Sequence, residues 1–121
     1  MRVVIVDDSV TSLTVAAAQA RALPSVEVVS FQDASAALTH LEQNPADLII
    51  TDYLMPQIDG LTLLSRVREL PRHTSTPMLM MTSDQTQQLR DQAVEQGASG
   101  LLNKPYDGVE FKLQVGALLF N

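Results

Sequence analysis

Short apolar segments rich in β-branched residues are the feature that most constrains how this chain folds. They show little polar–apolar alternation and occupy residues 3–6, 26–31, 48–51 and 78–82, with a weaker fifth candidate at 100–102. A strand that is apolar on both faces has to be covered on both faces, which is typical of a parallel sheet between two helix layers.

Longer segments with helical spacing alternate with these strands, at residues 9–23, 33–43, 60–70, 85–96 and 109–120. In segment 60–70, for example, Leu61, Leu64 and Val67 recur at intervals of three residues. The alternation predicts an α/β fold with a doubly wound, five-stranded parallel sheet and five flanking helices. Because crossovers are right-handed, few topologies remain, and the simplest has the strand order 2-1-3-4-5.

Length and composition narrow the class of protein. The 121 residues predict one domain over 1–121, and the absence of cysteine excludes disulfide scaffolds, thiolate metal sites and cysteine nucleophiles. The formal net charge of −6, from 8 basic and 14 acidic residues, argues against direct binding of nucleic acid. No apolar run approaches the ~20 residues of a membrane span, and the first residues do not resemble a signal peptide. The default expectation is a cytoplasmic protein with no membrane contact.

Polar residues follow four of the five predicted strands. In a doubly wound sheet the carboxyl ends of the strands meet at one edge, where ligands bind. The chain would place there three carboxylates, a hydroxyl group and an ammonium group, contributed by Asp7, Asp8, Asp52, Thr82 and Lys104.

This combination of side chains indicates a site that binds a cation and a phosphate. Two unit charges ~4 Å apart repel by about 4 kcal/mol at an effective dielectric near 20, so three ionised carboxylates favour the entry of a divalent cation. An all-oxygen site suits Mg²⁺. Lys104, one of two lysines in the chain, can neutralise one acid and hold a phosphoryl oxygen.

Each of these residues also has an ordinary explanation when it is taken alone. Asp8 or Ser9 can cap the helix that follows, Asp52 can be a turn residue, and Lys104 can lie in a solvated loop. The joint occurrence of an acid pair, a single acid, a hydroxyl and a lysine at four strand ends favours a functional site.

Four motifs resemble the receiver domain of two-component response regulators, particularly those of the chemotaxis-regulator type. They are Val-Asp-Asp-Ser at 6–9, Asp-Tyr-Leu-Met-Pro-Gln-Ile-Asp-Gly at 52–60, Met-Thr-Ser at 81–83 and Gly-Ala-Ser-Gly-Leu-Leu-Asn-Lys-Pro-Tyr at 97–106. The resemblance covers nearly the whole chain and implies a flavodoxin-like fold. It also implies that Asp52 accepts a phosphoryl group, and that Mg²⁺ binds Asp7, Asp8, Asp52 and the backbone carbonyl of Leu54.

The resemblance further implies a conformational switch. The hydroxyl of Thr82 would turn onto the phosphoryl group, Lys104 would pair with it, and the Lys104–Pro105 bond would be cis. One departure is Leu101, which stands where many receivers carry Tyr or Phe. Either Leu101 repacks without a rotamer change, or the signal passes mainly through the loop after Thr82 and the helix that follows.

The implied function is that of a signalling phosphoacceptor rather than an enzyme. A bacterial sensor histidine kinase or phosphotransfer protein would supply the phosphoryl group, the transfer would be self-catalysed and Mg²⁺-dependent, and autodephosphorylation would be slow. The output would be a further domain or a separate target, and a homodimer would form through the fourth helix, fifth strand and fifth helix. Residues 109–119 faintly resemble receivers that are joined to cyclic-di-GMP-hydrolysing domains.

Three alternatives are weighed against this interpretation. A haloacid-dehalogenase-type phosphatase needs a second aspartate where Leu54 stands, and a flavodoxin-like cofactor binder needs a neutral turn where Asp7 and Asp8 would repel phosphate. A pseudo-receiver that acts without phosphorylation is the third.

A few structural expectations complete the analysis. His40 and His73 are expected to be solvated, and Gly60 to supply an unusual backbone angle. Asp59 is expected to cap the third helix. Three methionines are expected in the core, at positions 78, 80 and 81.

Overall fold

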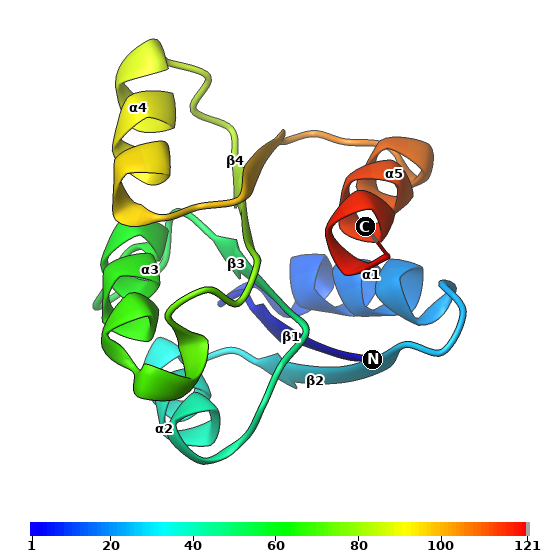
Figure 1. The fold of residues 1–121 in the computed structure, drawn as a ribbon. Helices are drawn as coiled ribbons and strands as arrows, with labels where there is room; N and C mark the ends of the chain where they lie inside the picture. The colour runs from blue at the N-terminus through cyan, green and yellow to red at the C-terminus, as the bar shows by residue number, and fades with distance from the viewer. Residues whose placement is uncertain (121) are drawn as a thin grey trace.

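The strands form one parallel sheet in the computed structural model, which describes residues 1–120 (Figure 1). The strand order is β2-β1-β3-β4-β5, as predicted. The strands are β1 (Arg2–Val6), β2 (Glu27–Phe31), β3 (Leu48–Asp52), β4 (Met78–Thr82) and β5 (Gly100–Asn103).

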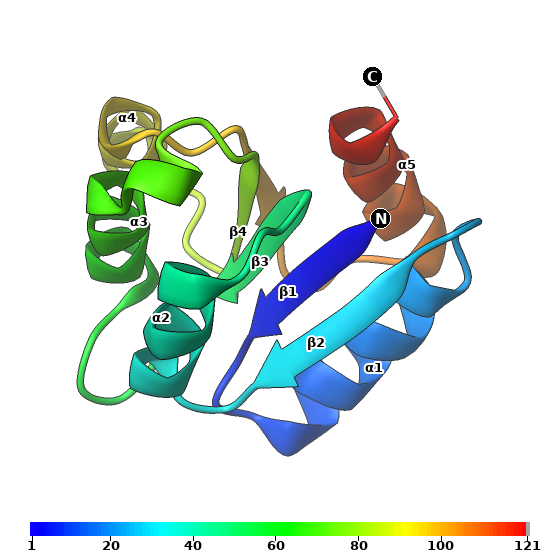
Figure 2. The same ribbon diagram turned by 60° about the horizontal axis from the view of Figure 1, so that its bottom comes forward.

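Helices cover both faces of the sheet, which confirms the predicted doubly wound architecture. Figures 1 and 2 show α1 (Val10–Arg21) and α5 (Gly108–Leu119) on one face. The other face carries α2 (Ala34–Gln43), α3 (Gly60–Glu69) and α4 (Gln87–Gln96), and a short 3₁₀ helix, η1 (Pro71–His73), follows α3.

The two apolar faces of the strands explain this layering. All five residues of β3 and all five of β4 are buried. Ile5 and Ile50 pack against the α1 and α5 side, whereas Val4 and Ile49 pack against the α2 and α3 side. Burial of each such side chain contributes about 1.5–3 kcal/mol. The three strand methionines are at most 1% exposed, which confirms their place in the core.

Side-chain caps determine where the helices begin. Ser9 caps α1, and Asp59 caps α3 by accepting a 2.8 Å hydrogen bond from the Thr62 N–H group. The predicted segment 85–96 begins as a helix only at residue 87, because Thr86 is the cap of α4. A cap residue keeps an extended backbone while its side chain accepts from the first turn. Among residues 1–120 no helix has both the length and the apolar character to cross a membrane.

The expectation of a solvated His73 is wrong. The side chain is fully buried, and its Nε2 lies 2.9 Å from the Leu41 carbonyl and 3.0 Å from the Asn44 carbonyl. The last carbonyls of a helix lack intrahelical donors, so a ring held under the end of α2 satisfies them. His40 is half-buried against the Phe31 ring, at a centroid distance of 5.2 Å, so it is also less solvated than expected.

The expectation that Gly60 supplies an unusual backbone angle is wrong. The residues with positive φ are Ser25, Gln57 and Gly97. A Cβ atom at Gly60 would lie 2.7 Å from the Asp52 carbonyl oxygen and 3.0 Å from the Met80 sulfur. Glycine is therefore required at this position by the close approach of the chain to Asp52, and not by a backbone angle.

Candidate functional site

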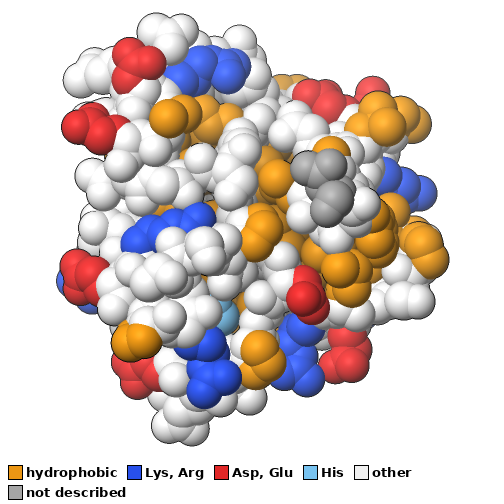
Figure 3. Space-filling view, viewed as in Figure 1, with side chains coloured by type: hydrophobic (Ala, Val, Ile, Leu, Met, Phe, Trp, Pro, Cys, Tyr) orange, Lys and Arg blue, Asp and Glu red, His pale blue; other side chains and the backbone are white. Residues whose placement is uncertain are grey.

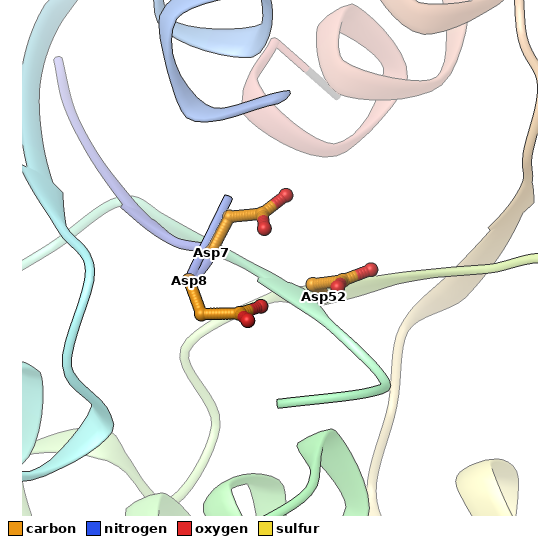
Figure 4. A group of neighbouring side chains, drawn as sticks. All are labelled: Asp7, Asp8 and Asp52. Carbon is orange, nitrogen blue, oxygen red and sulfur yellow. The ribbon is translucent and has the colours of Figure 1, made fainter. Parts of the chain in front are cut away.

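Three carboxylates meet where β1 and β3 end (Figure 4). One carboxylate oxygen from each of Asp7, Asp8 and Asp52 lies within 4.8 Å of the other two. The parallel pairing aligns Val6 with Thr51, so the next residue along each strand reaches the same edge. Asp7 is fully buried, Asp52 is 8% exposed and Asp8 is exposed. The structure therefore brings together the predicted acidic residues.

Lys104 completes this cluster from the loop after β5. Its Nζ lies 2.7 Å from Asp52 Oδ1 and 3.6 Å from Asp7 Oδ2. The backbone N–H group of Lys104 donates a 2.8 Å hydrogen bond to the Thr82 carbonyl. The Lys104–Pro105 peptide bond is cis, as expected. Burial alone would lower the pKa of Lys104, but the hydrogen bond and charge of Asp52, with the charge of Asp7, raise it above its ordinary value.

The buried Asp7 carboxylate lies in surroundings that disfavour its negative charge. Burial raises its pKa above the usual 3.8, and the charges of Asp52 and Asp8 act in the same direction. The Ser9 N–H group, 3.0 Å from Oδ1, and the Lys104 ammonium only partly oppose this effect. Asp7 Oδ2 is buried without a hydrogen-bond donor. A buried oxygen without a hydrogen bond in an all-carboxylate cluster fits a hard divalent cation such as Mg²⁺.

Thr82 ends β4 with 3% of its surface exposed. Its hydroxyl oxygen accepts a 2.9 Å hydrogen bond from the Asp84 N–H group. Asp84 Oδ1 in turn accepts a 2.9 Å bond from the Thr86 N–H group. In this structure the hydroxyl is thus engaged with its own loop. The analysis of the sequence missed this contact, although hydroxyl and carboxylate residues two apart are typical of such turns.

The two other predicted positions lie at the margins of the site. Leu54 lies in the loop after β3 and is 67% exposed. Leu101 is half-buried and packs against a small cluster formed by Met80, Leu89 and Ala93. Its aliphatic side chain offers no polar atom to Thr82.

A cavity of about 400 Å³ opens beside Lys104. Its walls come from α1 and from the loop between β5 and α5, and they include Val15, Gln19, Pro105 and Tyr106. The Tyr106 ring stacks on Phe111 at a centroid distance of 5.4 Å. Lys104 is the residue that this cavity shares with the site, because none of the three carboxylates lines it.

The fold and the strand-end residues together define a receiver-type signalling domain. The sequence profile of the response regulator receiver domain matches residues 3–115, and the chain belongs to this family. Receiver domains are signalling domains that bind Mg²⁺ at an acidic site and act with histidine kinases and output domains.

Individual proteins agree with this assignment. The cyclic di-GMP phosphodiesterase response regulator RpfG of Xanthomonas campestris pv. campestris is 32% identical over 120 residues, which are 98% of this chain and 32% of that protein. The probable chemotaxis protein CheY of Rhizobium etli is 28% identical over 118 residues, 98% of this chain and 92% of that protein. The solved structure of the chemotaxis response regulator CheY4 of Vibrio cholerae matches with a TM-score of 0.91 at 26% identity, over 98% of both chains. The chain thus spans about a third of the length of RpfG and most of the length of the Rhizobium etli protein.

Proposed function

We propose that this chain accepts a phosphoryl group on Asp52 in a Mg²⁺-dependent reaction and then changes conformation to control an output domain or partner. The observation that carries the proposal is the 2.7 Å contact of Lys104 Nζ with Asp52 Oδ1, beside two further carboxylates. An ammonium and a candidate cation site that share one carboxylate suit a phosphoryl group better than they suit a structural ion pair.

The chemistry follows from the positions of the side chains. A carboxylate oxygen of Asp52 attacks the phosphorus atom, the P–N bond of a phosphohistidine or the P–O bond of an acyl phosphate breaks, and the leaving group keeps the electron pair. Lys104 neutralises negative charge on the transferred group. Asp7, Asp8, Asp52 and the Leu54 carbonyl would hold Mg²⁺, which neutralises charge on the phosphoryl oxygens when it is bound.

The donor and the output are proposed from the family. A bacterial sensor histidine kinase or phosphotransfer protein would supply the phosphoryl group in the cytoplasm. The acyl phosphate formed would hydrolyse slowly without a further enzyme. The output would be a linked domain, as in longer regulators such as RpfG, or a separate target.

The proposed homodimer would use α4, β5 and α5. Figure 3 shows hydrophobic side chains gathered over α5. Val94 of α4 is 70% exposed and Leu113 of α5 is 69% exposed. A concentration series by size-exclusion chromatography, with and without beryllofluoride, tests the dimer. Wild type should elute earlier with the mimic and Leu113→Glu should not, whereas equal elution volumes throughout would contradict the dimer.

The phosphoacceptor role is tested by the intact mass of the protein after incubation with acetyl phosphate. We expect a mass increase of one phosphoryl group that requires both Mg²⁺ and Asp52, so Asp52→Asn and metal-free samples should stay unmodified. Labelling that persists in Asp52→Asn would overturn the assignment. If no adduct forms, a beryllofluoride titration separates the pseudo-receiver, which would not bind the mimic, from a receiver that accepts only from its cognate kinase.

The role of Lys104 is tested with Lys112, the other lysine of the chain, as the control. Lys104→Ala should still bind Mg²⁺ but should lose most of its conformational response to the mimic, because the ammonium no longer reaches the phosphoryl oxygens. Lys112→Ala removes the same charge from an exposed position on α5 and should respond normally. Equal responses in the two variants would show that Lys104 is only a loop residue.

A further inference from the structure

The cavity beside Lys104 is not used by the proposed phosphoryl transfer. Its volume of about 400 Å³ lies in the range of roughly 300–1,000 Å³ that small-molecule sites in proteins occupy. Its lining comes from three parts of the chain, namely α1, the first residue after β4 and the loop after β5. These residues are Thr11, Ser12, Val15, Gln19, Ser83, Lys104, Pro105 and Tyr106.

The Tyr106 wall and the Gln19 end of this cavity are held by contacts within the protein. The Tyr106 ring stacks on Phe111, which is fully buried, at a centroid distance of 5.4 Å and an interplanar angle of 24°. Gln19 packs against the start of α5, since a Cβ atom at Gly108 would lie 3.2 Å from its Nε2. A ligand therefore meets preformed walls and pays little to order them.

The cavity differs in charge from the rest of the molecule. The whole chain has 14 acidic residues against 8 basic ones, and yet no Asp or Glu lines the cavity. Lys104 is the one charged residue among those that do. Val15, Pro105 and the Tyr106 ring supply apolar surface beside it. Apolar walls with a single cation are complementary to a molecule that has an apolar body and one negative group.

The ammonium of Lys104 has hydrogen-bonding capacity left for such a group. It carries three N–H donors, and it lies 2.7 Å from Asp52 Oδ1. Its distance of 3.6 Å to Asp7 Oδ2 is too long for a hydrogen bond, and that oxygen has no donor. The Lys104 side chain is 26% exposed. A further acceptor can therefore share the ammonium without breaking its bond to Asp52.

We propose that this cavity binds a small aromatic carboxylate, whose ring lies between Val15 and Tyr106 and whose carboxylate accepts a hydrogen bond from Lys104. The acidic cluster repels an anion, so the inference rests on the proposed function in one respect, namely that Mg²⁺ at that cluster balances much of its charge. A phosphoryl group on Asp52 would use the same ammonium. The ligand and the phosphoryl group should therefore weaken each other's binding.

Binding is tested by an NMR titration of the amide resonances in buffer that contains Mg²⁺, with 2-naphthoate as the probe. We expect saturable shifts at Val15, Gln19 and Tyr106, with a dissociation constant of about 0.1–1 mM. The neutral isostere 2-naphthamide should bind at the same residues roughly tenfold more weakly, because it lacks the charge-assisted hydrogen bond. Shifts that do not saturate, or that lie outside the cavity, would overturn the proposal. Equal affinities for the two probes would overturn the choice of an anion.

Two pairs of variants locate the ligand. Val15→Trp fills the cavity from a side chain that is 46% exposed and should abolish binding of 2-naphthoate. Val94→Trp makes the same change on the exposed side of α4, outside the cavity, and should bind normally. Lys104→Ala should bind 2-naphthoate no better than 2-naphthamide, whereas Lys112→Ala should keep the tenfold preference. Normal binding by Val15→Trp, or a kept preference in Lys104→Ala, would contradict the proposed position of the ligand.

The opposition between the ligand and a phosphoryl group is tested with beryllofluoride. Calorimetry first shows whether the mimic binds, and the 2-naphthoate titration is then repeated in its presence. The affinity for 2-naphthoate should fall several-fold while that for 2-naphthamide stays the same. An unchanged affinity for 2-naphthoate with the mimic bound would show that Lys104 is not shared. Failure of the mimic to bind would instead count against the proposed function, and the titrations without it would still decide whether the cavity binds an aromatic carboxylate.

Discussion

At the scale of single residues, Gly60 shows how a position next to the site is constrained by its backbone surroundings. Its N–H group donates a 2.7 Å hydrogen bond to the Tyr53 carbonyl, and an added Cβ would collide with the Asp52 carbonyl oxygen. Because the obstacle is backbone rather than a flexible side chain, relief requires movement of the segment that carries Asp52.

We therefore expect Gly60→Ala to destabilise the fold by about 1–3 kcal/mol, the usual cost of overpacking. It should also slow the phosphorylation of Asp52 by acetyl phosphate. Gly116→Ala is the matched control, since the nearest atom to its added Cβ is 4.0 Å away and it lies inside α5. Removing a glycine there should stabilise the protein by about 0.5–1 kcal/mol. Urea unfolding of both variants measures the difference, and equal stabilities would contradict the argument.

Other single residues show which parts of the site a sequence can predict. Asp7, Asp52 and Lys104 were placed correctly at one edge because strand ends converge in any doubly wound sheet, whatever the rotamers. The partner of the Thr82 hydroxyl and the burial of His73 could not be predicted in this way. Each depends on how a loop turns, and the ring of His73 meets carbonyls some 30 positions away, 32 at Leu41 and 29 at Asn44.

At the scale of elements, Arg68 connects α3 with the segment before β4 and with the end of α4. Its Nη1 donates to the His73 carbonyl at 2.9 Å and to the Thr76 carbonyl at 2.6 Å, and its Nη2 donates to the Gly97 carbonyl at 2.7 Å. Burial lowers its pKa from the ordinary value, but a guanidinium stays charged at any physiological pH. The residue that follows the C-terminal end of α4 is therefore anchored to α3.

Arg68→Lys should destabilise the protein by roughly 1–3 kcal/mol despite keeping the charge, because one ammonium cannot reach three carbonyls arranged for a planar fork. Arg66→Lys, on the exposed side of the same helix, should change stability by less than about 0.5 kcal/mol. Thermal unfolding of both proteins provides the comparison. If Arg68→Lys were as stable as Arg66→Lys, the three carbonyl contacts would contribute little to the fold.

Helix boundaries illustrate a second limit of prediction at this scale. Apolar spacing located all five helices, since each has to bury one side on the sheet. It placed the start of α4 two residues early, because spacing carries no information on whether Thr86 is the first helical residue or the cap. The Thr86 N–H group also donates to Asp84 Oδ1, so the misassigned residue lies where the loop after β4 meets the helix.

At the scale of the whole molecule, we expect the acidic site to lower the stability of the metal-free protein. The chain carries a formal net charge of −6, and three of its carboxylates are gathered at one edge. Lys104 pairs closely with Asp52, which leaves Asp7 as the buried and poorly compensated charge. If Asp7 loses its charge, the Lys104 ammonium still pairs with Asp52. The usual penalty for breaking a buried ion pair therefore does not apply.

The raised pKa of Asp7 determines how the stability of the fold depends on pH. A carboxyl whose pKa is higher in the folded state than its usual 3.8 favours folding while it is protonated, and this contribution is lost as the pH rises through the folded-state pKa. Asp7→Asn should therefore be more stable than wild type at pH 7 without metal, by roughly 1–2 kcal/mol. The two proteins should converge below the ordinary pKa, where both side chains are neutral.

With Mg²⁺ present, wild type should become more stable than Asp7→Asn. A ligand present at 100 times its dissociation constant stabilises the folded state by about 2.7 kcal/mol, so wild type should gain in Mg²⁺ while Asp7→Asn gains much less. Urea unfolding from pH 3 to 8, with and without Mg²⁺, measures both effects, and Glu95→Gln, at an exposed carboxylate outside the site, is the comparison. A metal-free Asp7→Asn protein less stable than wild type at pH 7 would show that Asp7 is held by favourable contacts. The acidic edge would then owe its arrangement to folding rather than to the cation and phosphoryl group it is proposed to bind.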